Sequence, residues 1–373
     1  MSDPDLSSDL SPDLSSGRAP VAAAIHLSIT LGLGAMGGWV FSLFHIPLAW
    51  MLGSMITATI IAMSGGTFLE RPIKLRAVML VVLGVMLGSS FTPAVMERIS
   101  AWMITLSFMT VFLVIVTVIG WVALRRWTRF DTTTAYFSAV PGGFTMMVVT
   151  GGAMGGDDRT IALVHSLRIM MTVLTIPLWF RLMHGVVPPD MASQLTQATG
   201  FMDLTIRDTA ILLALGSAGA LIGKLVRMPT YTLVGPMVLS GIAHLTGITS
   251  AKPPVELVNA AQVVIGTSIG CRFLGVVARE VPRTLICGVF TSFYLLIAGA
   301  LAALFLEPYT GISFAALWLA FAPGGITEMA ILSIALGADP AFVATHHLYR
   351  IVLLLVLAPL AYSLYQRWRA AQR

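Results

Sequence analysis

The sequence has 373 residues, of which 57% are hydrophobic and 10% are charged, whereas about 25% of the residues in a soluble domain carry a charge. So few charges cannot cover a water-exposed surface, and one core cannot hide so many apolar side chains, so a soluble globular enzyme and a disordered chain are both excluded. The formal net charge is +5 and the mean hydropathy is +0.89, which together favour an all-α polytopic membrane protein.

The two ends of the chain differ from the rest. Residues 1–20 are mostly polar and acidic, which predicts a disordered N-terminal tail without the positive start of a signal peptide. Residues 366–373 form a short basic C-terminal tail. Between them lie twelve apolar segments, most of which reach the ~20 residues that cross a bilayer core. The segments cover roughly 21–43, 47–64, 75–93, 98–124, 131–155, 158–183, 206–226, 229–248, 257–276, 281–306, 311–337 and 340–365.

Two of these segments contain a helix-breaking motif. Segment 131–155 carries Pro-Gly-Gly at 141–143, and segment 311–337 carries the same tripeptide at 323–325. Proline has no backbone N–H to donate within a helix, and glycine adds backbone freedom. We therefore expect each of these two segments to form a broken or re-entrant helix.

The chain is an internal duplication. A shift of 182 residues overlays the sequence on itself without a gap, and rare residue types recur in register. The duplication predicts repeat 1 at 21–183, a polar linker at 184–205 and repeat 2 at 206–365. The matched pairs include Gly84 with Gly266, Gly88 with Gly270, Asp157 with Asp339, His165 with His347, Arg168 with Arg350 and Pro177 with Pro359.

Loop charges indicate that the two repeats have opposite orientations. Lys and Arg concentrate in cytoplasmic loops. In repeat 1 they follow the second and fourth segments, but in repeat 2 they follow the first and third. An inverted repeat needs an odd number of crossings in each half. We therefore expect about ten crossings plus the two broken segments, with both termini cytoplasmic and the linker outside. These basic residues are Arg71, Lys74, Arg76, Arg125, Arg126, Arg129, Lys224, Arg227, Arg279 and Arg283.

The broken segments are the main functional signal. A helix break in a bilayer leaves N–H and C=O groups without partners, which is tolerated where these groups line a cavity or bind a solute. Helix N-termini favour anions and C-termini favour cations. Breaks at equivalent places of an inverted repeat indicate a substrate site near the midplane, and the alternative is a pair of packing kinks. The substrate-binding candidates are Pro141, Gly142, Gly143, Thr145, Pro323, Gly324, Gly325, Thr327, Arg168 and Arg350.

Each repeat also has a histidine and an arginine on one helix face. They are spaced i, i+3 in both copies. An arginine at the centre of a membrane helix costs about 2.5–3.5 kcal/mol on insertion scales, so it needs a partner. Two interpretations stay open: the arginines hold an anionic substrate, or they bond to the open carbonyls of the broken helices. The carboxylates considered as partners are Asp157, Asp339 and Glu328.

Glu328 breaks the symmetry of the duplication, because its counterpart is Met146. A buried carboxylate three residues after Gly325 could take up and release a coupling proton. The alternative is that it caps the half-helix or interacts with its dipole. The other coupling candidates are Asp157, Asp339, His165 and His347.

Several signals are missing from the sequence. It has no P-loop, no HExxH motif and no dense His/Asp/Glu cluster, so we expect no ATP-driven step, no metal and no cofactor. Cys271 and Cys287 lie in apolar stretches, which argues against a disulfide framework. The basic residues form short loop clusters, so we expect no nucleic-acid partner.

The motifs resemble those of the AbrB-type bacterial membrane protein family. The resemblance rests on Pro-Gly-Gly-x-Thr-x-Met, a following Gly-x-Asp and an arginine-bearing helix, all present twice within roughly 20–365. Members carry the labels "ammonia monooxygenase" or "transcriptional regulator", so the resemblance implies a link to regulation of gene expression. The family is grouped with cation/proton antiporters, bile-acid symporters and auxin carriers, which implies inverted repeats with two broken helices crossing near the midplane. The paired Asp of electrogenic antiporters is missing, which favours an organic or anionic solute.

We therefore expect a secondary transporter in the bacterial inner membrane. It would move a small, anionic or organic solute by alternating access, coupled to protons or sodium. The alternative is a membrane protein that influences gene expression indirectly, without transport. We expect no enzyme, because a membrane oxidase or monooxygenase would need ligands that are missing. The expected partners are the lipid bilayer and the solute, with a homodimer as an open alternative.

Overall fold

The computed structural model describes residues 20–44, 46, 48–93, 99–184, 200–276 and 282–372. Within these ranges the chain forms helices and loops and has no strand, so the all-α expectation is confirmed. The predicted tail 1–20, apart from Pro20, lies outside the described residues, as does the part of the predicted linker at 185–199.

The helices of the two halves follow in the same order. The first half contains α1 (Pro20–Leu43), α2 (Ala49–Met63), α3 (Ile73–Gly88), α5 (Ile99–Trp127), α6 (Thr132–Ala139), α7 (Phe144–Ala153) and α8 (Asp158–His184). The second contains α10 (Ile206–Leu225), α11 (Tyr231–Leu245), α12 (Val255–Gly270), α13 (Pro282–Thr310), α14 (Phe314–Phe321), α15 (Ile326–Ala335) and α16 (Pro340–Ala371). Two 3-10 turns, η1 (Phe201–Asp203) and η2 (Cys271–Phe273), complete the regular structure of the described residues.

Helix bounds match between the halves. α2 and α11, α3 and α12, α6 and α14, and α7 and α15 have equal lengths and lie 182 residues apart. α8 and α16 also begin 182 residues apart, but α16 continues to Ala371. The predicted basic tail 366–373 is therefore helical up to that residue. The two halves of the chain therefore form the same succession of helices.

Six helices of the described chain are long and apolar enough to cross a membrane: α1, α5, α8, α10, α13 and α16. α2 and α11 have 15 residues each, and α3 and α12 have 16, below the ~20 residues that span a bilayer core without thinning. The protein is therefore a membrane-type helical protein with six candidate spans, fewer than the ten crossings expected from the sequence.

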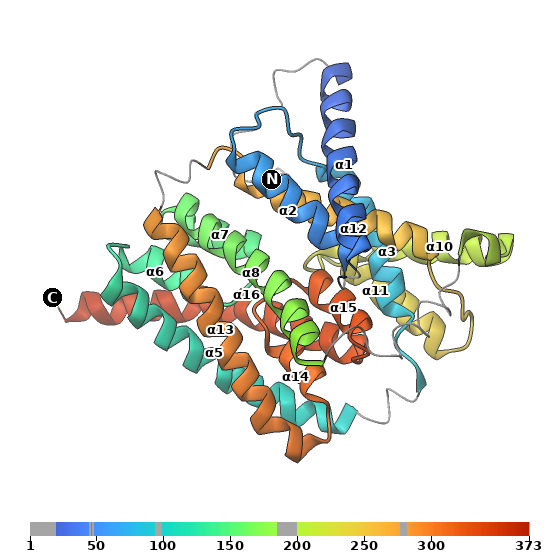
Figure 1. Ribbon diagram of the computed structural model, residues 1–373. Coiled ribbons are helices and arrows are strands. Elements are labelled where there is room, and N and C mark those ends of the chain that lie inside the picture. Colours follow the sequence, from blue (N-terminus) through green and yellow to red (C-terminus); the bar gives the residue numbers. More distant parts are fainter. Residues whose placement is uncertain are drawn as a thin grey trace.

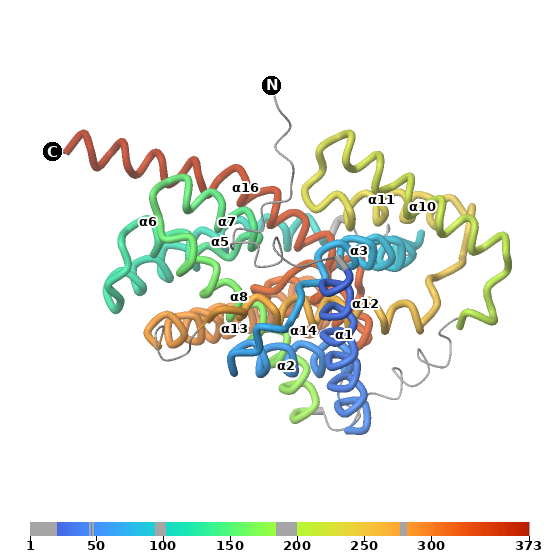
Figure 2. The backbone as a smooth tube through the Cα atoms, turned by 90° about the horizontal axis from the view of Figure 1, so that it is seen from above, coloured from blue at the N-terminus to red at the C-terminus, as the bar shows by residue number. Residues whose placement is uncertain are grey.

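The helices assemble into two bodies. α1, α2, α3, α10, α11 and α12 pack mostly against one another and form the six-helix body, whereas α5–α8 and α13–α16 form the eight-helix body. Figure 1 shows the six-helix body at the upper right and the eight-helix body at the lower left, and Figure 2 shows the same helices from above. Each body takes half its helices from each half of the chain. The η2 turn packs on α2 and α12 and belongs to the six-helix body, and contacts between the bodies come from α3 with α15 and α16, and from α8 with α2 and η2.

Glycines hold the six-helix body together across the two halves. α3 packs on α11, and α12 packs on α2. At four glycines of α3 and α12 an added Cβ would overlap a backbone carbonyl oxygen of the facing helix, so only glycine permits this approach. The four contacts, again at equivalent positions, are Gly84 on Leu233, Gly88 on Met237, Gly266 on Met51 and Gly270 on Met55.

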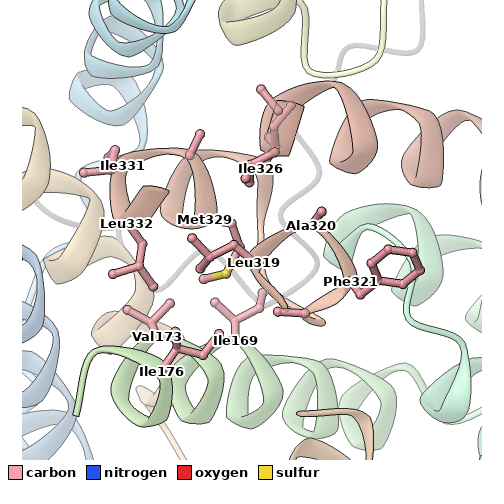
Figure 3. Packing of buried hydrophobic residues seen from close by; sticks show 14 of the residues in the cluster. Ile169, Val173, Ile176, Leu319, Ala320, Phe321, Ile326, Met329, Ile331 and Leu332 are labelled. Atoms are coloured by element: carbon pink, nitrogen blue, oxygen red, sulfur yellow. The ribbon is translucent and has the colours of Figure 1, made fainter. Parts of the chain in front are cut away.

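The eight-helix body has an apolar interior of buried side chains around α14 and α15. Figure 3 shows Ile169, Val173 and Ile176 of α8 directed at the residues of α15, with Met329 and Leu332 facing them. All these side chains are buried. A helix from the first half therefore packs directly on the broken segment of the second half.

Candidate functional site

Both Pro-Gly-Gly segments are broken helices, as the sequence predicts. α6 ends at Ala139 and α7 begins at Phe144, and the equivalent break separates α14 from α15. The residues before the two prolines, Val140 and Ala322, have extended backbones with ψ of 123° and 145°. A proline disfavours helical ψ at the preceding residue, so each first half-helix must end there.

The spacing of the motif is explained by a contact between glycine and methionine. A Cβ on Gly142 would lie 2.9 Å from the Met147 side chain, and a Cβ on Gly324 would lie 2.7 Å from that of Met329. Both methionines are buried, with exposures of 1% and 0%. The second half-helix therefore folds its own methionine back over the break, and a larger residue than glycine would displace it.

Arg168 ties the two breaks together. It projects from α8 and is 1% exposed. Its Nη1 and Nη2 donate hydrogen bonds to the carbonyl oxygens of Val140 (3.0 Å) and Gly142 (2.9 Å) in the first break. Its Nε donates to the carbonyl oxygen of Pro323 (3.1 Å) in the second break. One guanidinium thus holds carbonyls that the two interruptions leave without helical donors.

Arg350 makes the equivalent bonds to its own break. Its Nη1 donates to the carbonyl oxygen of Ala322 (2.6 Å) and its Nη2 to that of Gly324 (2.5 Å). The same Nη2 also donates to Nδ1 of His347 (2.9 Å). Its Nε is buried without a hydrogen-bond partner. Of the two interpretations open from the sequence, these contacts are those of arginines that satisfy the carbonyls of the broken helices.

The histidines on the same faces anchor the half-helices before each break. Nε2 of His165 lies 2.9 Å from the carbonyl oxygen of Phe137, and Nε2 of His347 lies 2.9 Å from that of Leu319. A carbonyl only accepts, so Nε2 carries the proton and Nδ1 of a neutral imidazole is an acceptor. In His347 this acceptor takes the Arg350 bond, whereas Nδ1 of His165 is buried without a partner.

The aspartates cap helices and do not contact the arginines. Asp339 is the N-cap of α16 and accepts from the backbone N–H of Ala341 (2.9 Å) and Phe342 (3.3 Å). Asp157 directly precedes α8 and accepts from the N–H of Arg159 (3.2 Å). The carboxylates considered as partners of Arg168 and Arg350 are thus replaced by carbonyls, because a broken helix leaves strong backbone acceptors beside the guanidinium.

The two second half-helices differ in exposure. Thr327 and Glu328 of α15 are buried, with exposures of 5% and 4%. Thr145 and Met146, their counterparts in α7, are exposed. The Glu328 carboxylate lies against the N-cap of α15, since a Cβ on Gly325 would overlap it. α15 also packs against α3 of the six-helix body (Figure 1).

A further polar contact near the site was not expected from the sequence. His346 is buried, and its Nε2 lies 2.8 Å from Oγ1 of Thr105 on α5. On the same two helices the hydroxyls of Tyr349 and Thr110 lie 2.7 Å apart. The sequence did contain a signal for these contacts: His346 and Tyr349 are three residues apart in an apolar helix. Polar side chains there must find partners inside the bundle.

These features define a class: a membrane-type helical protein in which two interrupted helices are held by buried arginines from the helices that follow them. The chain belongs to the AbrB family, whose description is "Transition state regulatory protein AbrB" and which matches residues 50–366. It is similar to the "Uncharacterized protein YhjN" of Bacillus subtilis (strain 168), with 28% identity over 351 residues, 90% of this chain and 91% of that protein. It is also similar to the "Putative regulator AbrB" of Escherichia coli (strain K12), with 26% identity over 334 residues, 89% of this chain and 92% of that protein.

Proposed function

We propose that this protein is a secondary transporter that moves a small, anionic or organic solute across the bacterial inner membrane by alternating access. The observation that carries the proposal is the pair of interrupted helices at equivalent positions, joined by Arg168. Such interruptions at repeat interfaces are where transporters bind solutes. The solute would lie between Pro141–Thr145 and Pro323–Glu328, flanked by Arg168 and Arg350.

The unequal closure of the two breaks supports alternating access. Thr327 is buried on α15, a helix that meets the six-helix body, while Thr145 is exposed. Each body contains helices from both halves, and few pairs of helices join the bodies. A displacement of one body along the other would open one break as it closes the other.

The proposed topology is an inverted repeat. The six long apolar helices cross the membrane, and α2, α3, α11 and α12 supply four shorter crossings, with α6/α7 and α14/α15 as the interrupted segments. Both termini are cytoplasmic. A cysteine at Met202, which is 99% exposed, should then react with a membrane-impermeant reagent from outside, and one at the exposed Lys74 should not. Reaction at Lys74 and protection at Met202 would contradict this topology.

Charge favours an anionic solute. The arginine bonds described above go to neutral carbonyls and to one imidazole, so they leave the positive charge of two buried guanidinium groups without compensation. A carboxylate or other anion would be attracted to this region. Glu328 is the proposed coupling group. Its carboxylate is buried at the start of α15, whereas the equivalent residue of α7 in the other repeat is Met146, which cannot titrate.

Uptake into proteoliposomes tests the proposal. A panel of small carboxylates and other metabolites should show accumulation of at least one solute under a pH or Na⁺ gradient. No accumulation of any solute by either gradient would contradict transport. Glu328→Gln should retain exchange of the transported solute but lose its dependence on the gradient. Glu256→Gln, the same change at an exposed carboxylate in the first turn of α12, is the matched control and should keep that dependence.

A second candidate function is indirect regulation of gene expression without transport. The word "regulator" in the name of the Escherichia coli relative favours it. Deletion of the gene should then change transcript levels, and complementation with a chain that carries Arg168→Gln and does not transport should restore them. If complementation requires a transporting chain, any regulatory effect follows from the solute. Neither candidate is an enzymatic activity.

A further inference from the structure

Two hydrogen bonds in the arginine network have no counterpart in the other half. Arg168 Nε donates to Pro323 O (3.1 Å), but the equivalent Nε of Arg350 has no partner. Arg350 Nη2 donates to His347 Nδ1 (2.9 Å), but the equivalent Nδ1 of His165 has no partner. Each unpaired atom therefore has an equivalent in the opposite repeat that does make a hydrogen bond.

Both unpaired atoms are buried. Arg350 is 3% exposed and His165 is 0% exposed. A buried donor or acceptor without a partner is costly, and persistent cases need an explanation. Arg350 Nε is a donor and His165 Nδ1 is an acceptor. One cause that leaves both atoms unpaired is the simplest explanation.

The side chain of Arg168 provides that cause. Arg168 reaches across with Nε to the carbonyl of the other break, and no hydrogen bond joins it to His165. Arg350 stays within its own break and therefore bonds to its own histidine. In this state each arginine makes one of the two bonds: Arg168 makes the bond to the other break, and Arg350 makes the bond to its own histidine.

We propose that Arg168 and Arg350 are positioning residues that exchange these roles between two states of the protein. In the second state Arg350 Nε donates to the carbonyl oxygen of Pro141, and Arg168 returns to Nδ1 of His165. The state described here and the second state then have the same number of bonds, in mirrored places. Each therefore satisfies the groups that the other leaves unpaired.

The exposure of the half-helices agrees with this exchange. In the present state Arg168 crosses to the second break, and Thr327 beyond that break is buried while Thr145 is exposed. In the second state Arg350 crosses to the first break, so Thr145 becomes buried and Thr327 exposed. The inference rests on the proposed transport function and identifies the contacts that distinguish its two states.

Spin-label accessibility at these two threonines tests the exchange. The chain carries Cys271→Ala and Cys287→Ala, with either Thr145→Cys or Thr327→Cys and a nitroxide label, in lipid nanodiscs without solute or gradient. Collisions with oxygen and with a nickel chelate report exposure to lipid and to water respectively. In the otherwise unchanged chain the label at 145 should be the more accessible.

Histidine variants should shift the two labels in opposite directions. His347→Gln removes the acceptor of the Arg350 bond, which only the present state contains, and should lower accessibility at 145 and raise it at 327. His165→Gln removes the acceptor that only the second state uses and should do the reverse. The ratio of the two states should change roughly tenfold for the loss of one charge-assisted hydrogen bond. Arg159→Lys, at the exposed start of α8, is the control and should change neither label.

Glutamine keeps a donor near the Nε2 position and lacks an acceptor at Nδ1, so each histidine variant weakens one state only. Arg168→Lys and Arg350→Lys each remove one distinguishing bond from both states, so they should shift the labels less than the histidine variants do. Equal shifts for the two histidine variants, or none, would overturn the exchange.

The accessibility result is independent of uptake. Opposed shifts without uptake of any solute would reject the proposed transport and keep the exchange between two states. Gradient-driven uptake with unchanged accessibility in all four variants would reject the exchange and keep transport.

Discussion

Arg168 Nε donates a hydrogen bond to the carbonyl oxygen of Pro323, at 3.1 Å, so a helix of the first half is bonded to the interruption of the second half. Its equivalent, Arg350, bonds only within the second half among the contacts described above. Two arginines at the same position of one motif therefore have different neighbours. The local sequences around the two arginines are alike, so the difference comes from how the two interrupted segments lie relative to each other.

Removal of the Arg168 guanidinium should destabilise the protein strongly. Arg168→Gln loses charge-assisted bonds to three carbonyls, each worth about 1.5–3 kcal/mol, although glutamine can retain one. We expect a loss of at least ~3 kcal/mol, measured as a lower thermal unfolding temperature in detergent. Arg159→Gln, exposed on the same helix, should change it little. Equal unfolding temperatures for the two variants would contradict the bridging role.

The last glycine of each Pro-Gly-Gly motif should respond differently to substitution by alanine in the two repeats. A Cβ on Gly143 meets nothing within 4 Å, whereas one on Gly325 overlaps the Glu328 carboxylate. Both have negative φ, −66° and −78°, which alanine tolerates. Gly325→Ala should cost about 1–3 kcal/mol through overpacking, and Gly143→Ala should stay within ~0.5 kcal/mol. Adding Glu328→Ala should recover most of the loss, and an unchanged loss would place its origin elsewhere.

Asp339 variants separate capping from coupling. Asp339→Ala removes the acceptor for two N–H groups of α16 and should cost about 1 kcal/mol. Asp339→Asn keeps an acceptor oxygen and should retain that stability without a titratable group. If gradient-driven uptake also survives in Asp339→Asn, Asp339 is a cap and not a coupling residue. Loss of gradient dependence in this stable variant would establish the coupling role expected from the sequence.

The close helix contacts of the six-helix body predict a third glycine effect. A Cβ on Gly266 would overlap the backbone of Met51, which cannot move away as a flexible side chain would. Gly266→Ala should therefore lower the unfolding free energy by about 1–3 kcal/mol. Gly32→Ala, in α1 with nothing within 4 Å, should be neutral or stabilising, since alanine favours helix. Similar losses for both would mean that close approach is not the cause.

Local features of the fold were predictable from the sequence, because they depend on residue type alone. The helix breaks follow from Pro141 and Pro323, and the polar pairs on α8 and α16 follow from their i, i+3 spacing. Close packing follows from the spaced glycines. In each case the physical cause acts within a few residues of the motif.

The partners of the arginines could not be predicted in this way. A sequence shows side-chain charges, which directed attention to Asp157, Asp339 and Glu328, but it does not show which carbonyls a break leaves exposed. A duplicated sequence also predicts equivalent contacts in both halves. The cross-break bond of Arg168 and the unpaired Nε of Arg350 arise only when the halves meet in one particular state.

The glycine contacts have a consequence for how the chain is made. α2 finds its partner in α12, and α3 finds its partner in α11, so neither pairing can form while only the first half has left the ribosome. Before the later helices arrive, α2 can pack on α1 but not on α12, and α3 cannot pack on α11. A chain that stops between the halves is therefore an unfinished protein, and not a smaller version of the complete one.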